Sequence, residues 1–285
     1  MSATVQLLPG GRLHLQHGPI DVILRAWGEP AEVAKAYRAA AARFSTILDE
    51  LVAELPALRA PAGAPVRGPV ARRMAAAVAG FDEFVTPMAA VAGAVADELL
   101  DVMRGAAALQ KAYVNDGGDI ALHLAPGEGL RIGVAADFSR GPVPAIDGAV
   151  LLRGEDGIGG VATSGFQGRS FSLGIADAVT VLAATAARAD AAATLVANAV
   201  DVDSPAIARR PARDLDPDSD LGARPVTVAV GPLSEAEIKA ALARGAARAE
   251  RFRAAGVLAA AALTLRGRTR IVGAAAARPL ALECR

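Results

Sequence analysis

Residues 159–200, GGVATSGFQGRSFSLGIADAVTVLAATAARADAAATLVANAV, hold almost all of the sequence's rare polar residues in apolar surroundings. Polar groups in such surroundings need hydrogen-bond partners or a ligand. The pattern predicts a strand ending in a Ser-Gly turn (Gly159–Thr163), a buried strand (Ala178–Ala184) and a short alanine-rich helix (Ala189–Ala199).

Two polar residues of this helix, Asp190 and Thr194, are four positions apart. Residues at this spacing share one helix face, so the pair suits one hard cation. The alternative role for Asp190 is to cap the N-terminus of the helix. Both interpretations remain open at this point.

The composition excludes several classes of protein. Thirty basic residues balance thirty acidic ones and only 4% of residues are aromatic, which argues against nucleic-acid binding. One cysteine, Cys284, excludes an internal disulfide and a cysteine-based metal site. No signal-peptide pattern and no uninterrupted apolar run of about 20 residues occurs. We therefore expect a cytoplasmic protein with no membrane segment.

Hairpins and helices alternate along the rest of the chain, which predicts antiparallel sheets packed with helices, an α+β fold. The length fits one large domain of residues 1–285 or two intertwined α+β halves. Ser234 and Glu237 form a capping-box pattern at the start of a helix. The expected elements are hairpin strands at Arg12–Gln16 and Ile20–Trp27, helices at Glu29–Leu58, Val70–Ala79, Pro87–Met103 and Ser234–Ala254, loops at Ser139–Gly148 and Asp201–Arg224, and a terminal hairpin at Gly256–Ala275.

The segment Asn115-Asp116-Gly117-Gly118-Asp119 separates two apolar runs. Asx-Gly pairs in this position are typical of hairpin turns, because a tight primed turn needs positive φ angles. Two glycines beside carboxylates can also bring a phosphate or a metal close to the backbone. The pattern therefore predicts a hairpin and leaves a ligand-binding role for the turn open.

Four stretches, VTPMAAVAGAVADELL, AYVNDGGDIALHL, GGVATSGFQGRSFSLGIADAVTVLA and ADAAATLVANAV, together resemble an uncharacterised protein family of the ApbE-like superfamily. The resemblance runs from Gly11 to the C-terminal hairpin, and more distantly the chain is similar to the ApbE flavin transferases. It implies a T-fold-like α+β fold with antiparallel sheets. It further implies binding of FAD or FMN with Mg²⁺, and either transfer of FMN to a partner protein or hydrolysis of FAD.

Carried over to this sequence, the resemblance implies a site. In the ADA-x-x-T pattern of ApbE-type enzymes, Asp190 and Thr194 would hold the Mg²⁺. The GGD turn corresponds to Gly117-Gly118-Asp119, preceded by Asn115, and the Ser-Gly turn to Thr163-Ser164-Gly165. These turns would bind the diphosphate ligand.

Other positions of the family pattern are only partly kept. The GAIAKGYAVD pattern keeps Gly93 and Asp97 but has Ala92 where the enzymes carry a lysine. Gly174 stands where they carry a histidine. The alternative to an enzyme is therefore a cofactor-handling or protein-binding module on the same scaffold, and surfaces of small residues make a homodimer plausible.

Arg169 and two aspartates complete the expected site. Arg169 can pair bidentately with a phosphate, or form an ion pair with Asp177 or Asp119. If the site cleaves a pyrophosphate, the base must be Asp119, Asp177 or water.

Overall fold

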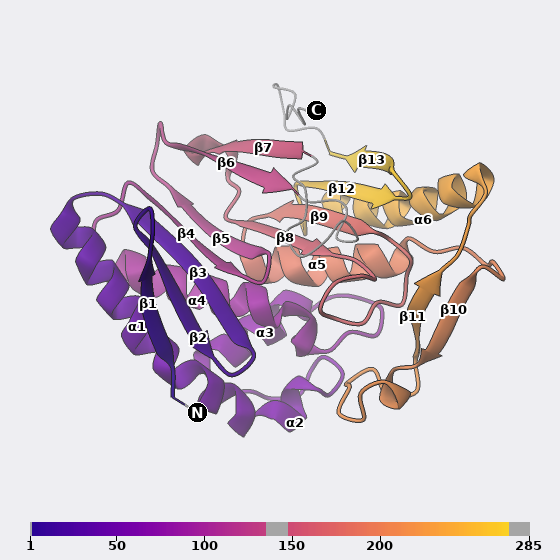
Figure 1. Cartoon of the computed structure of the whole chain (residues 1–285), viewed down its shortest axis with the longest axis horizontal. Helices are drawn as coiled ribbons and strands as arrows, with labels where there is room; N and C mark the ends of the chain where they lie inside the picture. The colour runs from indigo at the N-terminus through magenta and orange to yellow at the C-terminus, as the bar shows by residue number, and fades with distance from the viewer. Residues whose placement is uncertain (1, 135–147, 274–285) are drawn as a thin grey trace. The chain divides into compact units, whose positions relative to one another are not determined.

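The computed structural model describes residues 2–134 and 148–273 (Figure 1). Cys284 and nearly all of the predicted loop Ser139–Gly148 lie outside these residues. The chain divides into two compact units: unit 1 comprises Met1–Leu130, Arg153–Ala162 and Ala183–Ala191, and unit 2 comprises Arg131–Leu152, Thr163–Leu182 and Ala192–Arg285. Strand β8 (Gly160–Ser164) and helix α5 (Ala186–Ala199) each contribute residues to both units.

Unit 1 contains an antiparallel sheet with the strand order β1-β2-β3-β4-β5-β8. Alternate residues of these strands are buried, such as Val22 and Leu24 on β3 and Val114 on β4. This period of two places one face of the sheet in the core. The first five strands are β1 (Thr4–Leu8), β2 (Arg12–His17), β3 (Ile20–Trp27), β4 (Lys111–Asp116) and β5 (Asp119–Leu124).

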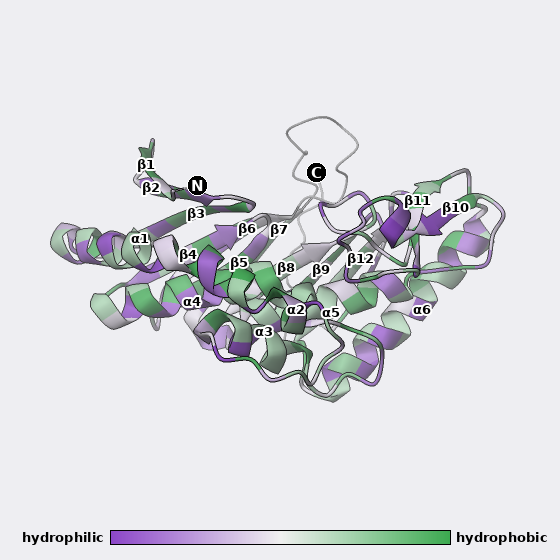
Figure 2. Cartoon of the chain, turned by 90° about the horizontal axis from the view of Figure 1, so that it is seen from below, coloured by the Kyte–Doolittle hydropathy of each residue, from purple (hydrophilic) through white to green (hydrophobic). Residues whose placement is uncertain are grey.

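Helix α4 packs on β4 and β5, and α1 packs on α4, β2 and β3, so both cover one face of these strands (Figure 2). Phe44, Ile47 and Leu51 of α1 are buried at helical spacing, as the sequence predicts. The helical segments of unit 1 are α1 (Pro30–Ala53), α2 (Leu55–Leu58), α3 (Pro69–Val78), the 3₁₀ turn η1 (Pro87–Ala90), α4 (Val91–Ala106) and the 3₁₀ turn η2 (Gly154–Asp156).

The single helix predicted over Glu29–Leu58 is interrupted at Glu54. Pro56 has no amide hydrogen to continue the helical ladder, which explains the break. The Glu54 carboxylate accepts hydrogen bonds from the amides of Arg67 and Gly68, both at 2.6 Å. The Glu54 side chain, which lies at this break, therefore anchors the loop that leads to α3.

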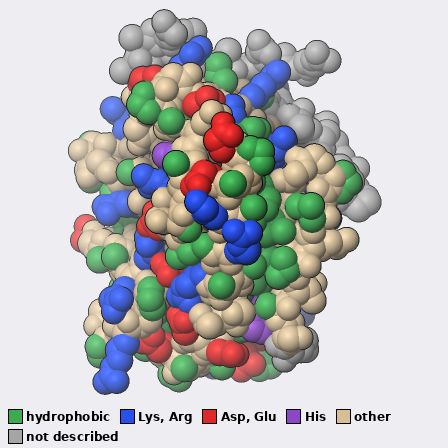
Figure 3. Space-filling model, turned by 90° about the vertical axis from the view of Figure 1, so that its left-hand side faces the viewer, with side chains coloured by type: hydrophobic (Ala, Val, Ile, Leu, Met, Phe, Trp, Pro, Cys, Tyr) green, Lys and Arg blue, Asp and Glu red, His purple; other side chains and the backbone are tan. Residues whose placement is uncertain are grey.

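Charged side chains of both signs are interspersed on the side of the molecule seen in Figure 3. In unit 1 several form a network across three helices: Glu98 of α4 binds Arg43 of α1 at 2.8 Å and Arg73 of α3 at 2.9 Å. Both arginines keep a raised pKa, Arg43 chiefly through its hydrogen bond to Glu50. This network holds the helical layer together.

Unit 2 contains strands in the order β8-β9-β12-β13 and two separate pairs, β6-β7 and β10-β11, of which β10-β11 is antiparallel. Helix α6 begins with the predicted capping box, in which the Glu237 amide donates to Ser234 Oγ and the Ser234 amide donates to Glu237 Oε2. The elements lying wholly or mostly in unit 2 are β6 (Gly129–Val134), β7 (Gly148–Arg153), β9 (Ala178–Ala183), β10 (Ile207–Pro211), the 3₁₀ turn η3 (Ala212–Asp214), β11 (Pro225–Val230), α6 (Glu235–Ala254), β12 (Ala260–Leu265) and β13 (Arg268–Val272).

The segment Asp201–Arg224 is not the continuous loop that its composition predicts. It contains β10, which pairs with β11 through a register shift between Ala208 and Arg209. The side chains of this strand are half-buried or exposed, so it lacks the apolar alternation from which a strand is recognised.

The fold class is α+β with antiparallel sheets packed with helices, as predicted. No helix in the described part of the chain is long and apolar enough to cross a membrane.

Candidate functional site

Asp190 lies in the second turn of α5 and does not cap it. The helix begins at Ala186, three residues before the predicted start, and the hydroxyl of Thr185 accepts the Arg188 amide at 3.3 Å. Alanine is the strongest helix former, so the Ala-rich run extends the helix toward Thr185. The capping interpretation of Asp190 is therefore wrong, and its carboxylate is available for another role.

The Asp190 carboxylate is held by the start of α4. Its Oδ2 accepts the backbone amide of Gly93 at 3.1 Å. Gly93 is the third residue of α4, where backbone amides have no partner within the helix and the helix dipole is positive. A Cβ atom at Gly93 would lie 2.3 Å from the Ala186 carbonyl oxygen, so only glycine allows this approach.

A second aspartate makes the reverse contact. Asp97 of α4 accepts the amide of Ala186 at 3.0 Å through Oδ1 and the amide of Ala187 at 2.9 Å through Oδ2. Each helix thus supplies a carboxylate to the N-terminus of the other. Sequence reasoning did not include Asp97 in the site, although a carboxylate four residues after Gly93 in an apolar run is a signal for it.

The carboxyl of Asp190 lies among other carboxyls. Its pKa is raised well above the ordinary value, first by burial and then by the charge of Asp119, with smaller effects of Asp116 and Asp97. The residue as a whole keeps some exposed surface. Burial also raises the pKa of Asp97 to about 6, against the hydrogen bonds from Ala187 and Ala186.

The GGD turn brings Asp119 to this group. Asp116 and Asp119 face each other across the β4-β5 hairpin, and Gly117 and Gly118 adopt φ angles of 64° and 113°. The Asn115 side-chain oxygen accepts the Gly118 amide at 2.8 Å and so stabilises the turn. A Cβ atom at Gly118 would meet nothing within 4 Å, so the backbone angle and not crowding requires this glycine.

The remaining predicted residues belong to unit 2, where several have structural contacts. The Thr163 hydroxyl bonds to the Thr180 hydroxyl at 2.9 Å. A Cβ atom at Gly165 would lie 2.3 Å from the Asp177 carbonyl oxygen, and Asp177 Oδ2 accepts the amide of Arg266. Ser164 is half-buried at the end of β8, and Arg169 is exposed.

Thr194 follows Asp190 by one turn of α5 and is half-buried. The spacing places both side chains on one helix face. Within residues 2–134 and 148–273, no group of three or more His, Cys, Asp or Glu side chains is arranged to hold a metal ion. The oxygen donors nevertheless fit Mg²⁺, which commonly takes one or two carboxylates and completes its shell with water and phosphate oxygens.

Two positions that the resemblance pairs with a lysine and a histidine are occupied by small residues. Ala92 lies in the first turn of α4. Gly174 packs so tightly that a Cβ atom there would lie 2.1 Å from the Ala197 carbonyl oxygen. This backbone therefore excludes any side chain, including histidine, at position 174.

Comparisons with known proteins agree on one family. A family model described as "AbpE bacteria" matches residues 5–271. A UPF0280 protein of Methanothrix thermoacetophila is 37% identical, over 66% of this chain and 77% of that protein. The UPF0280 protein of Methanosphaerula palustris is 42% identical over 48% of this chain, and the match spans 55% of that relative.

Among solved structures, the apo form of the Pseudomonas stutzeri flavinyl transferase ApbE aligns with a TM-score of 0.43 and 14% sequence identity. The alignment covers 95% of this chain and 94% of that one.

Proposed function

The chain belongs to the AbpE bacteria family, and from this premise we propose that it binds a flavin nucleotide or a related diphosphate ligand together with Mg²⁺. Asp190 and Thr194 would hold the cation. The two turns, with Asn115, Gly117 and Gly118 in one and Thr163, Ser164 and Gly165 in the other, would bind the ligand, with Arg169 on its phosphate. The reaction would be transfer of FMN or hydrolysis of FAD in the cytoplasm.

The observation that carries this proposal is the grouping of the buried Asp190 carboxyl, held by the Gly93 amide, with Asp119, Asp116 and Asp97, which raises the pKa of Asp190. Grouped carboxyls repel one another when ionised, and such perturbed groups are concentrated at functional sites. A divalent cation would relieve the repulsion. When bound, Mg²⁺ would neutralise charge on the phosphate oxygens.

The protein's own groups have defined tasks in this proposal. The Gly93 amide orients the Asp190 carboxylate, and the hairpin turn presents Asp119 to it. Asp119 would accept a proton at its carboxylate. Asp177 is the other candidate proton acceptor, although one of its oxygens already accepts the amide of Arg266.

A specific observation favours the second candidate, a non-catalytic cofactor-handling or protein-binding module. The backbone at Gly174 leaves no space for a side chain where the enzymes have histidine, and Ala92 replaces their lysine. A module would bind its ligand or a partner protein, or form a homodimer, without Mg²⁺-dependent turnover.

Thermal unfolding with FAD, FMN and ADP, each with and without Mg²⁺, tests the proposal. A ligand at 100 times its Kd stabilises the fold by about 2.7 kcal/mol, which raises Tm by roughly 5 °C in a chain of this size. The Asp190→Asn variant should lose the Mg²⁺-dependent part of the increase. HPLC of the same mixtures for released FMN or AMP separates the enzyme from the module.

The unliganded Asp190→Asn variant gives a second readout. The asparagine side chain keeps an oxygen that can accept the hydrogen bond from the Gly93 backbone amide, but it carries no charge. At pH 8 the Tm of the variant should therefore not fall below that of the wild type. The control is Asp82→Asn, which neutralises an exposed aspartate of unit 1. If no ligand changes Tm in the wild type, or if Asp190→Asn retains the full Mg²⁺ effect, the proposal is wrong.

A further inference from the structure

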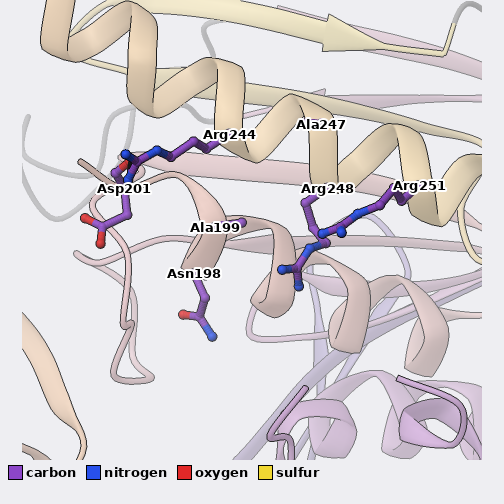
Figure 4. Close-up of a pocket in the computed structure, with 7 residues that line it drawn as sticks. All are labelled: Asn198, Ala199, Asp201, Arg244, Ala247, Arg248 and Arg251. Carbon is purple, nitrogen blue, oxygen red and sulfur yellow. Dashed lines mark hydrogen bonds between the residues drawn. The ribbon is translucent and has the colours of Figure 1, made fainter. Parts of the chain in front are cut away.

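Unit 2 contains a cavity of about 520 Å³ between α6 and the C-terminal end of α5 (Figure 4). Three of its lining residues are arginines of α6, and only one, Asp201, is acidic. This volume falls in the range of small-molecule sites. The complete lining is Asn198, Ala199, Asp201, Arg244, Ala247, Arg248 and Arg251.

The arginines come together because of their spacing on α6. Arg244, Arg248 and Arg251 follow the helical repeat of three and four residues, so they form one stripe. On the neighbouring face, Gly245 packs so closely that a Cβ atom would lie 2.3 Å from a methyl group of Val200. This approach brings the arginine stripe beside the end of α5, and Figure 4 shows Arg244 directed toward Asp201 and Arg248 and Arg251 leaving α6 further along the helix.

Inside the cavity, the charges of Arg244 and Arg251 are not balanced by the carboxylate of Asp201. The carboxylate of Asp201 is paired with Arg209, which does not line the cavity. Arg244 binds the backbone carbonyl of Asp201 at 3.3 Å instead of its carboxylate. Among the described residues no acidic side chain pairs with Arg251. Other arginines near this helix have such partners: Arg253 binds Glu250 and Arg268 binds Glu235, both at 2.8 Å.

Like charges three and four residues apart destabilise a helix. A bound anion would therefore stabilise a helix that carries three arginines in one stripe. The position of Arg251 in the last turn is favourable for the helix dipole, but Arg244 and Arg248 lie too far from the end for that effect. The Arg248 guanidinium also lies 5.7 Å from the Phe252 ring centre, which restrains it. Guanidinium groups are suited to bidentate binding of phosphate oxygens.

We propose that the cavity lined by Arg244, Arg248 and Arg251 binds the phosphate group of a small anionic ligand. The methyl groups of Ala199 and Ala247 and the aliphatic stems of the arginines would contact its apolar part. Asn198 contributes less, because its side-chain oxygen already accepts the amide of Leu173 at 2.9 Å. This site uses none of the residues of the Asp190 site.

Calorimetric titration of the full chain in EDTA tests the proposal, because EDTA removes the Mg²⁺ that the proposed Asp190 site would need. The probes are inorganic phosphate, pyrophosphate and phenyl phosphate. Saturable binding of phosphate or pyrophosphate indicates a site for a free inorganic anion, and a preference for phenyl phosphate indicates an organic phosphate; either result supports the proposal. Absence of saturable binding for all three overturns it.

Variants locate the binding. Arg251→Gln and the double variant Arg248→Gln/Arg251→Gln should weaken binding at least tenfold. Lys239→Gln removes one positive charge from the same helix outside the cavity and should leave binding unchanged. Arg251 is exposed, so its replacement does not threaten folding. Equal affinity of Arg251→Gln, the double variant and wild type, or equal loss in Lys239→Gln, would exclude the cavity as the site.

Discussion

At the scale of single residues, the Asp190 site depends on the absence of a Cβ atom at Gly93. The absent Cβ allows the Ala186 carbonyl to come close and leaves the Gly93 amide directed at Asp190. The carboxylate is therefore positioned by backbone atoms of α4, which are more rigidly placed than a side chain. The family pattern marks Gly93 as a candidate, but its contact with Asp190 joins residues 97 positions apart, so it could not be read from the sequence.

We predict that Gly93→Ala destabilises the protein by about 2 kcal/mol. Alanine is the better helix former by about 1 kcal/mol, but overpacking against a backbone carbonyl costs more than this gain. Urea unfolding measures the change.

The matched control is Gly105→Ala near the end of the same helix, where a Cβ atom meets nothing within 4 Å. It should stabilise the protein by up to about 1 kcal/mol. A Gly93→Ala variant as stable as Gly105→Ala would contradict the close packing at Gly93.

At the scale of elements, α4 and α5 are joined by exchange of carboxylates. Asp97 accepts two amides of α5, and Asp190 accepts one amide of α4. The helices and the β4-β5 hairpin follow from local patterns, such as Pro87 and the glycines of the turn. The pairing of α4 with α5 joins residues about 90 positions apart, so periodicity within either helix does not reveal it.

The raised pKa of Asp97 predicts a pH dependence of stability. The folded state binds the proton of Asp97 more tightly than the unfolded chain does. The contribution of this group to the free energy of unfolding is therefore fully present below pH 4 and is lost as the pH rises through about 6. The loss amounts to roughly 3 kcal/mol. Urea unfolding between pH 4 and pH 7 should therefore show stability falling through this window.

Asp97→Asn should flatten that part of the pH profile. It should also lower the free energy of unfolding at pH 4, because the nitrogen of the asparagine side chain cannot accept a hydrogen bond from a backbone amide of α5. Asp82→Asn, an exposed control, should keep the wild-type slope. An unchanged slope in Asp97→Asn would show that another group is responsible for the pH dependence.

At the scale of the whole molecule, the sequence predicts the α+β class and most elements, because their signals are local: the capping box at Ser234, the Asn115–Asp119 turn and the buried run at Ala178. Two strands, one at a sheet edge and one on the surface, are not predicted from the sequence. β1 is almost entirely exposed and β10 lies in a charged, proline-containing segment, so neither has the alternation that burial imposes.

For the site, the sequence supplies Asp190, Asp119 and Gly93 as candidates, and the structure brings these three together. Asp116 and Asp97 are not predicted as site residues, and the structure shows that their charges also act on Asp190. The roles of Thr163, Ser164, Gly165, Arg169, Asp177 and Thr194 stay predictions that the binding experiments address.

We predict that the chain unfolds as a single domain despite its two compact units. β8 and α5 contribute residues to both units, so melting one unit would disrupt a strand and a helix whose remaining residues belong to the other. The sequence has one tryptophan, Trp27, which reports on unit 1. Its fluorescence and the far-UV circular dichroism should give the same midpoint in urea. Two separate midpoints would show that the units unfold independently.

The close approach at Gly93 has a consequence for evolution. The atom that excludes a larger residue is the carbonyl oxygen of Ala186, which every amino acid would carry at that position. No compensating substitution at position 186 can therefore restore a variant at position 93, and a suppressor screen should recover only true revertants or changes that shift an entire helix.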